Sequence, residues 1–255
     1  MLKVLLARWQ QGHRTTKFPE GPPPALSERY RGRPAMDASK CADGCRGCQS
    51  ICPTGAISLT ERIRIDLGKC LFCGRCSDFC PNHAVRFTGD YRQSVRRRED
   101  LFVDGGPYRL ARALDKRAIA LFGRSLKLRQ VSAGGCNACE ADTNVLSTVG
   151  WDLGRFGIGF VASPRHADGL LVTGCVPENM KLALEKTYAA VGAPKLVIAV
   201  GACAISGGPY ADHPEAHNGV TNLLPVDLYI PGCPPHPLTI LDGLLRLLDR
   251  IGGNQ

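Results

Sequence analysis

The chain has 255 residues, a formal net charge of +9 and 44% hydrophobic residues, which is enough for one large domain or two small ones with a real core. It has no uninterrupted apolar run of about 18 residues, so we expect no membrane-spanning helix, and its short, charged N-terminus does not fit a secretory signal. Thirteen cysteines in a chain that we therefore expect in the reducing cytosol indicate metal ligands rather than disulfide bridges.

Residues 1–40 form a first segment without an obvious core of its own. Residues 1–12 predict a short amphipathic helix, which can rest on a membrane surface or a partner subunit or pack on its own domain. Residues 13–40 are rich in proline, glycine and arginine and have no periodicity. We expect them to form an extended arm that lies along a neighbouring subunit.

Residues 41–90 contain an internal repeat of two cysteine runs, each ended by Cys-Pro and followed by a short apolar strand at residues 56–59 and 84–87. The runs are Cys41-x3-Cys45-x2-Cys48-x3-Cys52 and Cys70-x2-Cys73-x2-Cys76-x3-Cys80. This spacing is typical of bacterial two-cluster ferredoxins, in which the fourth cysteine of each run binds the cluster of the other run. Zinc sites are disfavoured, because they rarely carry the third cysteine and the Cys-Pro.

The repeat predicts two [4Fe–4S] clusters with exchanged fourth ligands. The expected ligands of cluster one are Cys41, Cys45, Cys48 and Cys80. The expected ligands of cluster two are Cys70, Cys73, Cys76 and Cys52. The first run has one residue more than usual after its first cysteine; Gly44 can accommodate it, but an altered cluster one stays open.

Residues 91–130 are rich in arginine and lysine, and positions 108–128 show apolar residues at helical spacing. We interpret them as a helical connector whose charges face solvent or another subunit. From residue 131 to residue 255, strand patterns at 159–163, 169–173, 196–200 and 226–230 alternate with helical patterns at 178–191 and 237–251. This alternation predicts an α/β domain with a parallel, flavodoxin-like sheet. No G-x-G-x-x-G follows the first strand, which argues against a Rossmann nucleotide site.

Four cysteines of this second half stand in turns after apolar runs: Cys136, Cys139, Cys203 and Cys233. Parallel strands end at one edge of their sheet, so we expect these thiolates to converge there on a third [4Fe–4S] cluster. We interpret the remaining cysteine, Cys175, as a core thiol, with a spare ligand or a redox sensor as alternatives.

The positive charge is concentrated in residues 1–135, whereas the rest of the chain is slightly acidic. Such charge can indicate nucleic-acid binding. Twelve ligating thiolates around three metal cores would add roughly −6, which offsets much of the excess. We therefore expect no nucleic-acid partner.

Over nearly its whole length the chain resembles a known group of iron–sulfur subunits. The second half resembles the small subunit shared by energy-converting (group 4) [NiFe] hydrogenases, formate hydrogenlyase and respiratory complex I. The first half resembles the two-cluster ferredoxin subunit of formate hydrogenlyase, so the chain looks like a fusion of the two. The matching stretches are residues 68–76, 135–139, 167–174, 201–208 and 226–235.

The resemblance implies an electron-transfer subunit of a formate-hydrogenlyase-like oxidoreductase, peripheral on the cytoplasmic side of the cell membrane. Three [4Fe–4S] clusters would relay electrons to or from a separate large catalytic subunit, and this chain would hold no substrate-converting site. Further implied partners are membrane-arm subunits and an iron–sulfur protein that donates or accepts electrons. The family often has an acid near the position of Asp142, and Glu140 lies nearer to the cysteines. Such an acid either relays protons or is a charge favoured at a helix start.

Two interpretations remain beside this one. Complex I places its first two ligands side by side, so the Cys136-x2-Cys139 spacing favours the hydrogenase branch. The alternative is the iron–sulfur subunit of a nickel-free, complex-I-like oxidoreductase. Two C-x2-C pairs in the large subunit would mark a hydrogenase. A free-standing electron carrier is a third interpretation, which the extended arm disfavours. One residue of this chain departs from the family pattern, because Pro177 stands where the family usually has Thr.

Overall fold

The computed structural model describes residues 2–41, 44–59 and 63–251. Residues 42–43, within the first cysteine run, lie outside the described residues. The helices are α1 (Leu2–Gln11), α2 (Gly47–Ile51), α3 (Arg75–Phe79), α4 (Lys116–Phe122), α5 (Ala138–Asn144), α6 (Glu178–Ala190), α7 (Ala202–Ser206) and α8 (Pro237–Leu247). The strands are β1 (Pro34–Met36), β2 (Ile57–Leu59), β3 (Ile63–Asp66), β4 (Val85–Phe87), β5 (Phe102–Val103), β6 (Leu126–Ser132), β7 (Ile158–Phe160), β8 (Gly169–Thr173), β9 (Leu196–Val200) and β10 (Leu228–Ile230).

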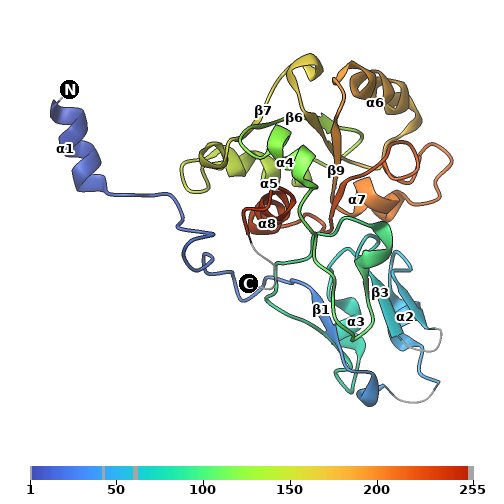
Figure 1. Cartoon of the computed structure of the whole chain (residues 1–255). Helices are drawn as coiled ribbons and strands as arrows, with labels where there is room; N and C mark the ends of the chain where they lie inside the picture. The colour runs from blue at the N-terminus through green and yellow to red at the C-terminus, as the bar shows by residue number, and fades with distance from the viewer. Residues whose placement is uncertain (1, 42–43, 60–62, 252–255) are drawn as a thin grey trace.

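The second half is built on a five-stranded sheet in the order β10-β9-β8-β6-β7 (Figure 1). All neighbouring strands are parallel. Counted from β6, this is the 2-1-3-4-5 order of doubly wound, flavodoxin-like proteins. The predicted α/β class with a parallel sheet is confirmed.

Helices cover both faces of this sheet. Leu171, Ile198 and Val200 belong to the core that contains α8, and every residue of α8 is buried. Leu170 and Val172 point to the other face, in the core that includes residues of α6 and α7. Strands β8 and β9 are therefore buried on both sides, which explains their continuous apolar sequences.

The first half places each cysteine run around a short helix. The first run surrounds α2 and the second surrounds α3, and these two helices pack against each other. Two small antiparallel sheets complete this half, β2-β3-β5 and β1-β4. The ferredoxin-like half and the parallel-sheet half are therefore distinct arrangements of strands.

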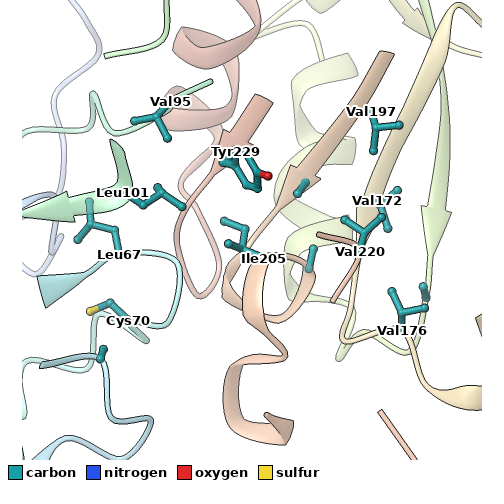
Figure 2. Packing of buried hydrophobic residues seen from close by; sticks show 14 of the residues in the cluster. Leu67, Cys70, Val95, Leu101, Val172, Val176, Val197, Ile205, Val220 and Tyr229 are labelled. Carbon is teal, nitrogen blue, oxygen red and sulfur yellow. The ribbon is translucent and has the colours of Figure 1, made fainter. Parts of the chain in front are cut away.

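The two halves nevertheless share one hydrophobic core. Leu67 and Leu101 of the first half belong to the same buried cluster as Ile205 and Tyr229 of the second (Figure 2). Val95 forms an antiparallel bridge to Tyr229, with N–H···O distances of 3.0 and 2.8 Å in the two directions. This shared core fixes the position of one half relative to the other.

The prediction of a helical connector at residues 91–130 is wrong for most of this segment. Within it α4 covers only Lys116–Phe122, and residues 126–130 belong to β6, an inner strand of the parallel sheet. In β6, Leu126 and Leu128 are fully buried while Lys127 between them is half-buried. This period of two is a strand pattern that the surrounding basic residues had hidden.

The arm at residues 13–40 makes contacts with its own chain, and its predicted contact with a neighbouring subunit stays a prediction. Phe18 is buried and packs edge-on against Tyr91, with 6.0 Å between ring centroids. Arg155 donates hydrogen bonds to the carbonyl oxygens of Thr16 and Phe18, at 2.6 and 2.5 Å. Further along, β1 pairs with β4. The arm therefore connects both halves.

Helix α1 precedes this arm at the edge of the molecule (Figure 1), and Val4, Ala7 and Arg8 line an open pocket together with residues 147–149. None of its residues is buried, and its large apolar side chains are exposed, Trp9 by 82%. Within the described part of the chain, no helix is long and apolar enough to span a membrane.

Candidate iron–sulfur centres

A small cavity in the first half is lined by four cysteines that come from both runs: Cys52, Cys70, Cys73 and Cys76. Most of the remaining lining is apolar, including Ile57, Ile65, Leu71 and Phe87. The structure thus brings together the four residues predicted for cluster two, including the cysteine exchanged from the first run. Four thiols around a mostly apolar space are the donor chemistry that a [4Fe–4S] cluster requires.

The electrostatics of this cavity favour a bound cation. Burial raises the pKa of Cys70 to about 12, and the neighbouring thiols of Cys76, Cys52 and Cys73 add to the shift. Burial likewise raises the pKa of Cys76 to about 11. Free thiolates are therefore costly here, and a positively charged metal core would compensate for that cost.

Backbone N–H groups donate to the cysteine sulfurs in the same way in both runs. The N–H of Ala56 lies 3.3 Å from the Sγ of Cys52, and the N–H of Ala84 lies 3.3 Å from the Sγ of Cys80. Each alanine follows its Cys-Pro pair at the same distance along the chain, so the sequence repeat is also a repeat of structure. Hydrogen bonds to sulfur are one means by which proteins set cluster potentials.

The cysteines predicted for cluster one are only partly brought together. The pKa of Cys48 is raised by burial and then by Cys41 and Cys45, so these three thiols are neighbours. Cys80 ends α3, which packs on the helix that carries Cys48. No described contact joins Cys80 to the other three, and its place in the set stays a prediction.

The third set lies at the carboxyl edge of the parallel sheet. Cys136 follows β6, Cys139 lies in α5, Cys203 lies in α7 and Cys233 follows β10. The pKa of Cys203 is raised to about 12, first by burial and then by Cys233, Cys175 and Cys136. Cys136 and Cys233 are exposed, so this site opens to the surface on one side.

Gly201 gives the third site its close packing. It has φ +89°, and a Cβ atom at this position would lie 2.5 Å from the Sγ of Cys139. Any other residue would be strained in this conformation and would push Cys139 away. Glycine therefore lets α7, with Cys203, begin next to the thiol of Cys139.

None of the three sets resembles a site for one ion. Among the residues that the structure describes, no three His, Cys, Asp or Glu side chains are gathered closely enough to hold a metal ion. A [4Fe–4S] core is larger than one ion, so its ligands stand farther apart than those of a zinc site.

Cys175 is buried, as expected of a core thiol, with its Sγ 3.8 Å from the carbonyl oxygen of Gly134. Its influence on the pKa of Cys203 shows that it also lies close to the third set. The two acids on α5 differ from each other. Glu140 is buried and hydrogen-bonded, whereas Asp142 is half-buried and burial raises its pKa.

A contact between the second and third sets could not be found from the sequence. The Oγ of Ser206, at the end of α7, donates to the carbonyl oxygen of Gly68 at 2.7 Å. Gly68 leads into Cys70, and Ser206 follows Cys203 by about one helical turn. Ser206 and Gly68 lie far apart in the chain, and no sequence pattern around either residue predicts this hydrogen bond.

Comparison with known proteins identifies related families in both halves of the chain. Residues 136–247 match the family described as NADH ubiquinone oxidoreductase, 20 Kd subunit, and residues 63–86 match a 4Fe-4S binding domain. The latter match includes the second cysteine run and not the first. Among solved structures, a chain of the membrane-bound sulfane sulfur reductase, an archaeal respiratory membrane complex, is 34% identical. That match covers 53% of this chain and 75% of that chain, with a TM-score of 0.46.

Curated relatives are subunits of oxidoreductase complexes. The probable membrane-bound hydrogenase subunit mbhJ of Pyrococcus furiosus is 38% identical over 141 residues, which are 54% of this chain and 84% of the relative. An NADH-quinone oxidoreductase subunit of Geotalea uraniireducens is 44% identical over 118 residues, 46% of this chain and 69% of the relative. Formate hydrogenlyase subunit 7 of Escherichia coli is 42% identical over 125 residues, 49% of each chain. The chain thus belongs to the iron–sulfur subunit family of the 20 kDa subunit of NADH ubiquinone oxidoreductase, joined to a 4Fe-4S binding domain.

Proposed function

We propose that this chain is the electron-transfer subunit of a formate-hydrogenlyase-like, group 4 [NiFe] hydrogenase complex and holds three [4Fe–4S] clusters. Relatives named as hydrogenase, formate hydrogenlyase and NADH-quinone oxidoreductase subunits support this assignment. Bound clusters would supply one-electron transfer, and the chain would position them and exclude water. The expected ligands are the three sets of four cysteines described above.

The observation that carries the proposal is the hydrogen bond from Ser206 to Gly68. It joins α7, which carries Cys203, to the turn that leads into Cys70. The pKa of Cys233 is raised by burial, then by Cys136 and then by Cys73, a member of the second set. The second and third sites are therefore neighbours, as an electron relay requires.

The electrostatic contacts also give an order for the sites. The pKa of Cys76, of the second set, is raised by burial and, among its neighbours, by Cys48 of the first set. These neighbours support an order in which the second site would lie between the first and the third. An electron partner would approach the end near Cys41 and Cys45, and the large catalytic subunit would cover the open edge near Cys136 and Cys233.

The alternative function is that of a nickel-free, complex-I-like oxidoreductase subunit, and the relatives named as NADH-quinone oxidoreductase subunits keep it open. The cysteine spacing of this chain favours the hydrogenase, and the metal content of the large subunit distinguishes the two functions. Metal analysis of the co-purified large subunit tests the proposal. Nickel together with two C-x2-C pairs would support a hydrogenase, and their absence would support the alternative.

We expect about twelve iron and about twelve sulfide per chain after anaerobic purification, because three sets of four thiolates are available. Cys175→Ser should leave both contents unchanged, since Cys175 belongs to none of the sets. Colorimetric iron and sulfide assays on both proteins check this. About eight iron in the wild type would contradict a third cluster, and loss of iron in the variant would make Cys175 a ligand.

We further propose that α1 attaches the complex peripherally to the cytoplasmic side of the membrane, beside membrane-arm subunits. The helix exposes Leu5 and Trp9 by 62% and 82%, and residues 2–19 contain five histidine, lysine and arginine side chains but no acid. Apolar side chains combined with basic charge favour the surface of an anionic bilayer.

Replacing both Leu5 and Trp9 with serine should weaken binding of the complex to anionic phospholipid vesicles by more than about tenfold, because two apolar side chains no longer enter the interface. Gln10→Ser in the same helix is the control and should bind like the wild type. Vesicle co-sedimentation measures both. Equal binding of all three proteins would show that α1 packs on a protein partner instead.

A further inference from the structure

Glu140 is a buried carboxylate that forms no ion pair among the residues that the structure describes. It is 5% exposed. Two other carboxylates are buried among the described residues, Asp66 and Asp242, and each pairs with an arginine, Arg98 at 2.5 Å and Arg246 at 2.8 Å. Within the same part of the chain, no ion pair involves Glu140. A buried charge without a counter-charge is costly and calls for a physical explanation.

Hydrogen bonds fix this carboxylate at the carboxyl edge of the sheet. The hydroxyl groups of Ser132 and Thr173 both donate to Oε1 of Glu140, each at 2.6 Å. Ser132 ends β6 and Thr173 ends β8, and the two residues are partners across this strand pair. The order of the sheet reverses between β6 and β8, and doubly wound proteins place their ligands outside the strand ends at such a point.

The carboxylate also lies close to the segment that carries two cysteines of the third set. Glu140 directly follows Cys139, and a side chain at Gly135, the residue before Cys136, would collide with its Oε1. The pKa of Cys139 is raised first by burial and next by the charge of Glu140. The two hydroxyl donors on Oε1 favour the charged form of this carboxylate, because hydrogen bonds donated to a carboxylate stabilise its negative charge.

We propose that the fixed negative charge of Glu140 lowers the reduction potential of the cluster held by Cys136, Cys139, Cys203 and Cys233. Reduction adds an electron to the cluster, and a nearby buried anion opposes this through Coulomb repulsion that water screens only weakly. This inference rests on the proposed function, because it requires a cluster at this site. A lower potential makes electrons at this site more strongly reducing toward the large subunit.

Glu140→Gln tests the charge while it preserves the shape of the side chain. The amide oxygen can still accept the hydrogen bonds from Ser132 and Thr173, so the fold at the strand ends should be kept. Redox titration of the complete complex, followed by EPR spectroscopy, should show one cluster potential moved upward and the others unchanged. Glu185→Gln, an exposed acid on α6, is the matched control and should move none.

Thr173→Val separates the charge from the structural role of the hydrogen bonds. This variant keeps the carboxylate but removes one of its two donors, so the less compensated charge should lower the same potential further. A purely structural role of Glu140 would shift the potential in the same direction in both variants. An unchanged or raised potential in Thr173→Val overturns the inference, even if Glu140→Gln fails to assemble.

The outcomes also separate this inference from the proposed function. If Glu140→Gln keeps its full iron content and no potential moves, the charge does not act on the cluster and the inference is wrong, although the relay stands. If the wild-type complex shows no third cluster by iron content and EPR spectroscopy, the proposed function fails and this inference fails with it.

Discussion

A Cys73→Ala variant should lose electron exchange with an external donor while hydrogen–deuterium exchange at the large subunit survives. Cys73 lines the cavity of the second set, so its loss should remove or cripple cluster two. None of the expected ligands of the third site precedes residue 136, so that site should still assemble. Loss of a residue that only supports a metal ligand lowers activity by about 10–100-fold. Cys73 is itself an expected ligand, so donor-linked activity should fall by more than this.

The measurement is made on a complex of verified subunit composition, with Cys175→Ser as the matched control. Both activities should be unchanged in the control. If Cys73→Ala kept full donor-linked activity in a complete complex, the electron relay would be wrong. The ferredoxin-like half would then act as a structural brace.

Cys203→Ala should be more damaging, with both donor-linked activity and hydrogen–deuterium exchange lost. Cys203 is bound into α7, which begins beside the thiol of Cys139 and ends at the hydrogen bond from Ser206 to Gly68. Removal of this ligand leaves an incomplete set at the edge where the large subunit would dock. Metal binding and folding are coupled at such sites, so assembly should suffer as well.

Iron content and the native mass of the complex report on this variant. We expect about four iron fewer per chain and less of the large subunit in the purified complex. Hydrogen–deuterium exchange at the wild-type rate would contradict a location of the third site at the subunit contact. Comparison with Cys73→Ala then gives the order of the sites along the relay.

The parts of the structure that were predictable from sequence depend on neighbouring residues. The spacing of Cys70, Cys73 and Cys76 is set by the geometry of a cluster, and the family matches support such a domain. Strands β8 and β9 are buried on both faces and so are apolar throughout, which made their predicted bounds correct. The cavity that joins Cys52 to the second run agrees with a pairing rule known for this repeat.

The parts that were missed depend on contacts between distant residues. Lys127 in β6 is half-buried between neighbouring strands, and in the sequence it looked like part of a charged helix. Phe18 anchors the arm on its own chain through a pocket that only the fold creates. The partners of Glu140 and Ser206 are equally invisible, because a hydroxyl group gives no sign of which distant acceptor it will reach.

The core shared by the two halves has a consequence for supply and stoichiometry. In two separate proteins, the contact between Val95 and Tyr229 would be a subunit interface, and it would weaken whenever one partner was scarce. On one chain the partner is always present at an effective concentration on the order of millimolar, even if the contact itself is weak. Each ribosome that completes this chain therefore delivers both halves in equal number, and dilution cannot separate them.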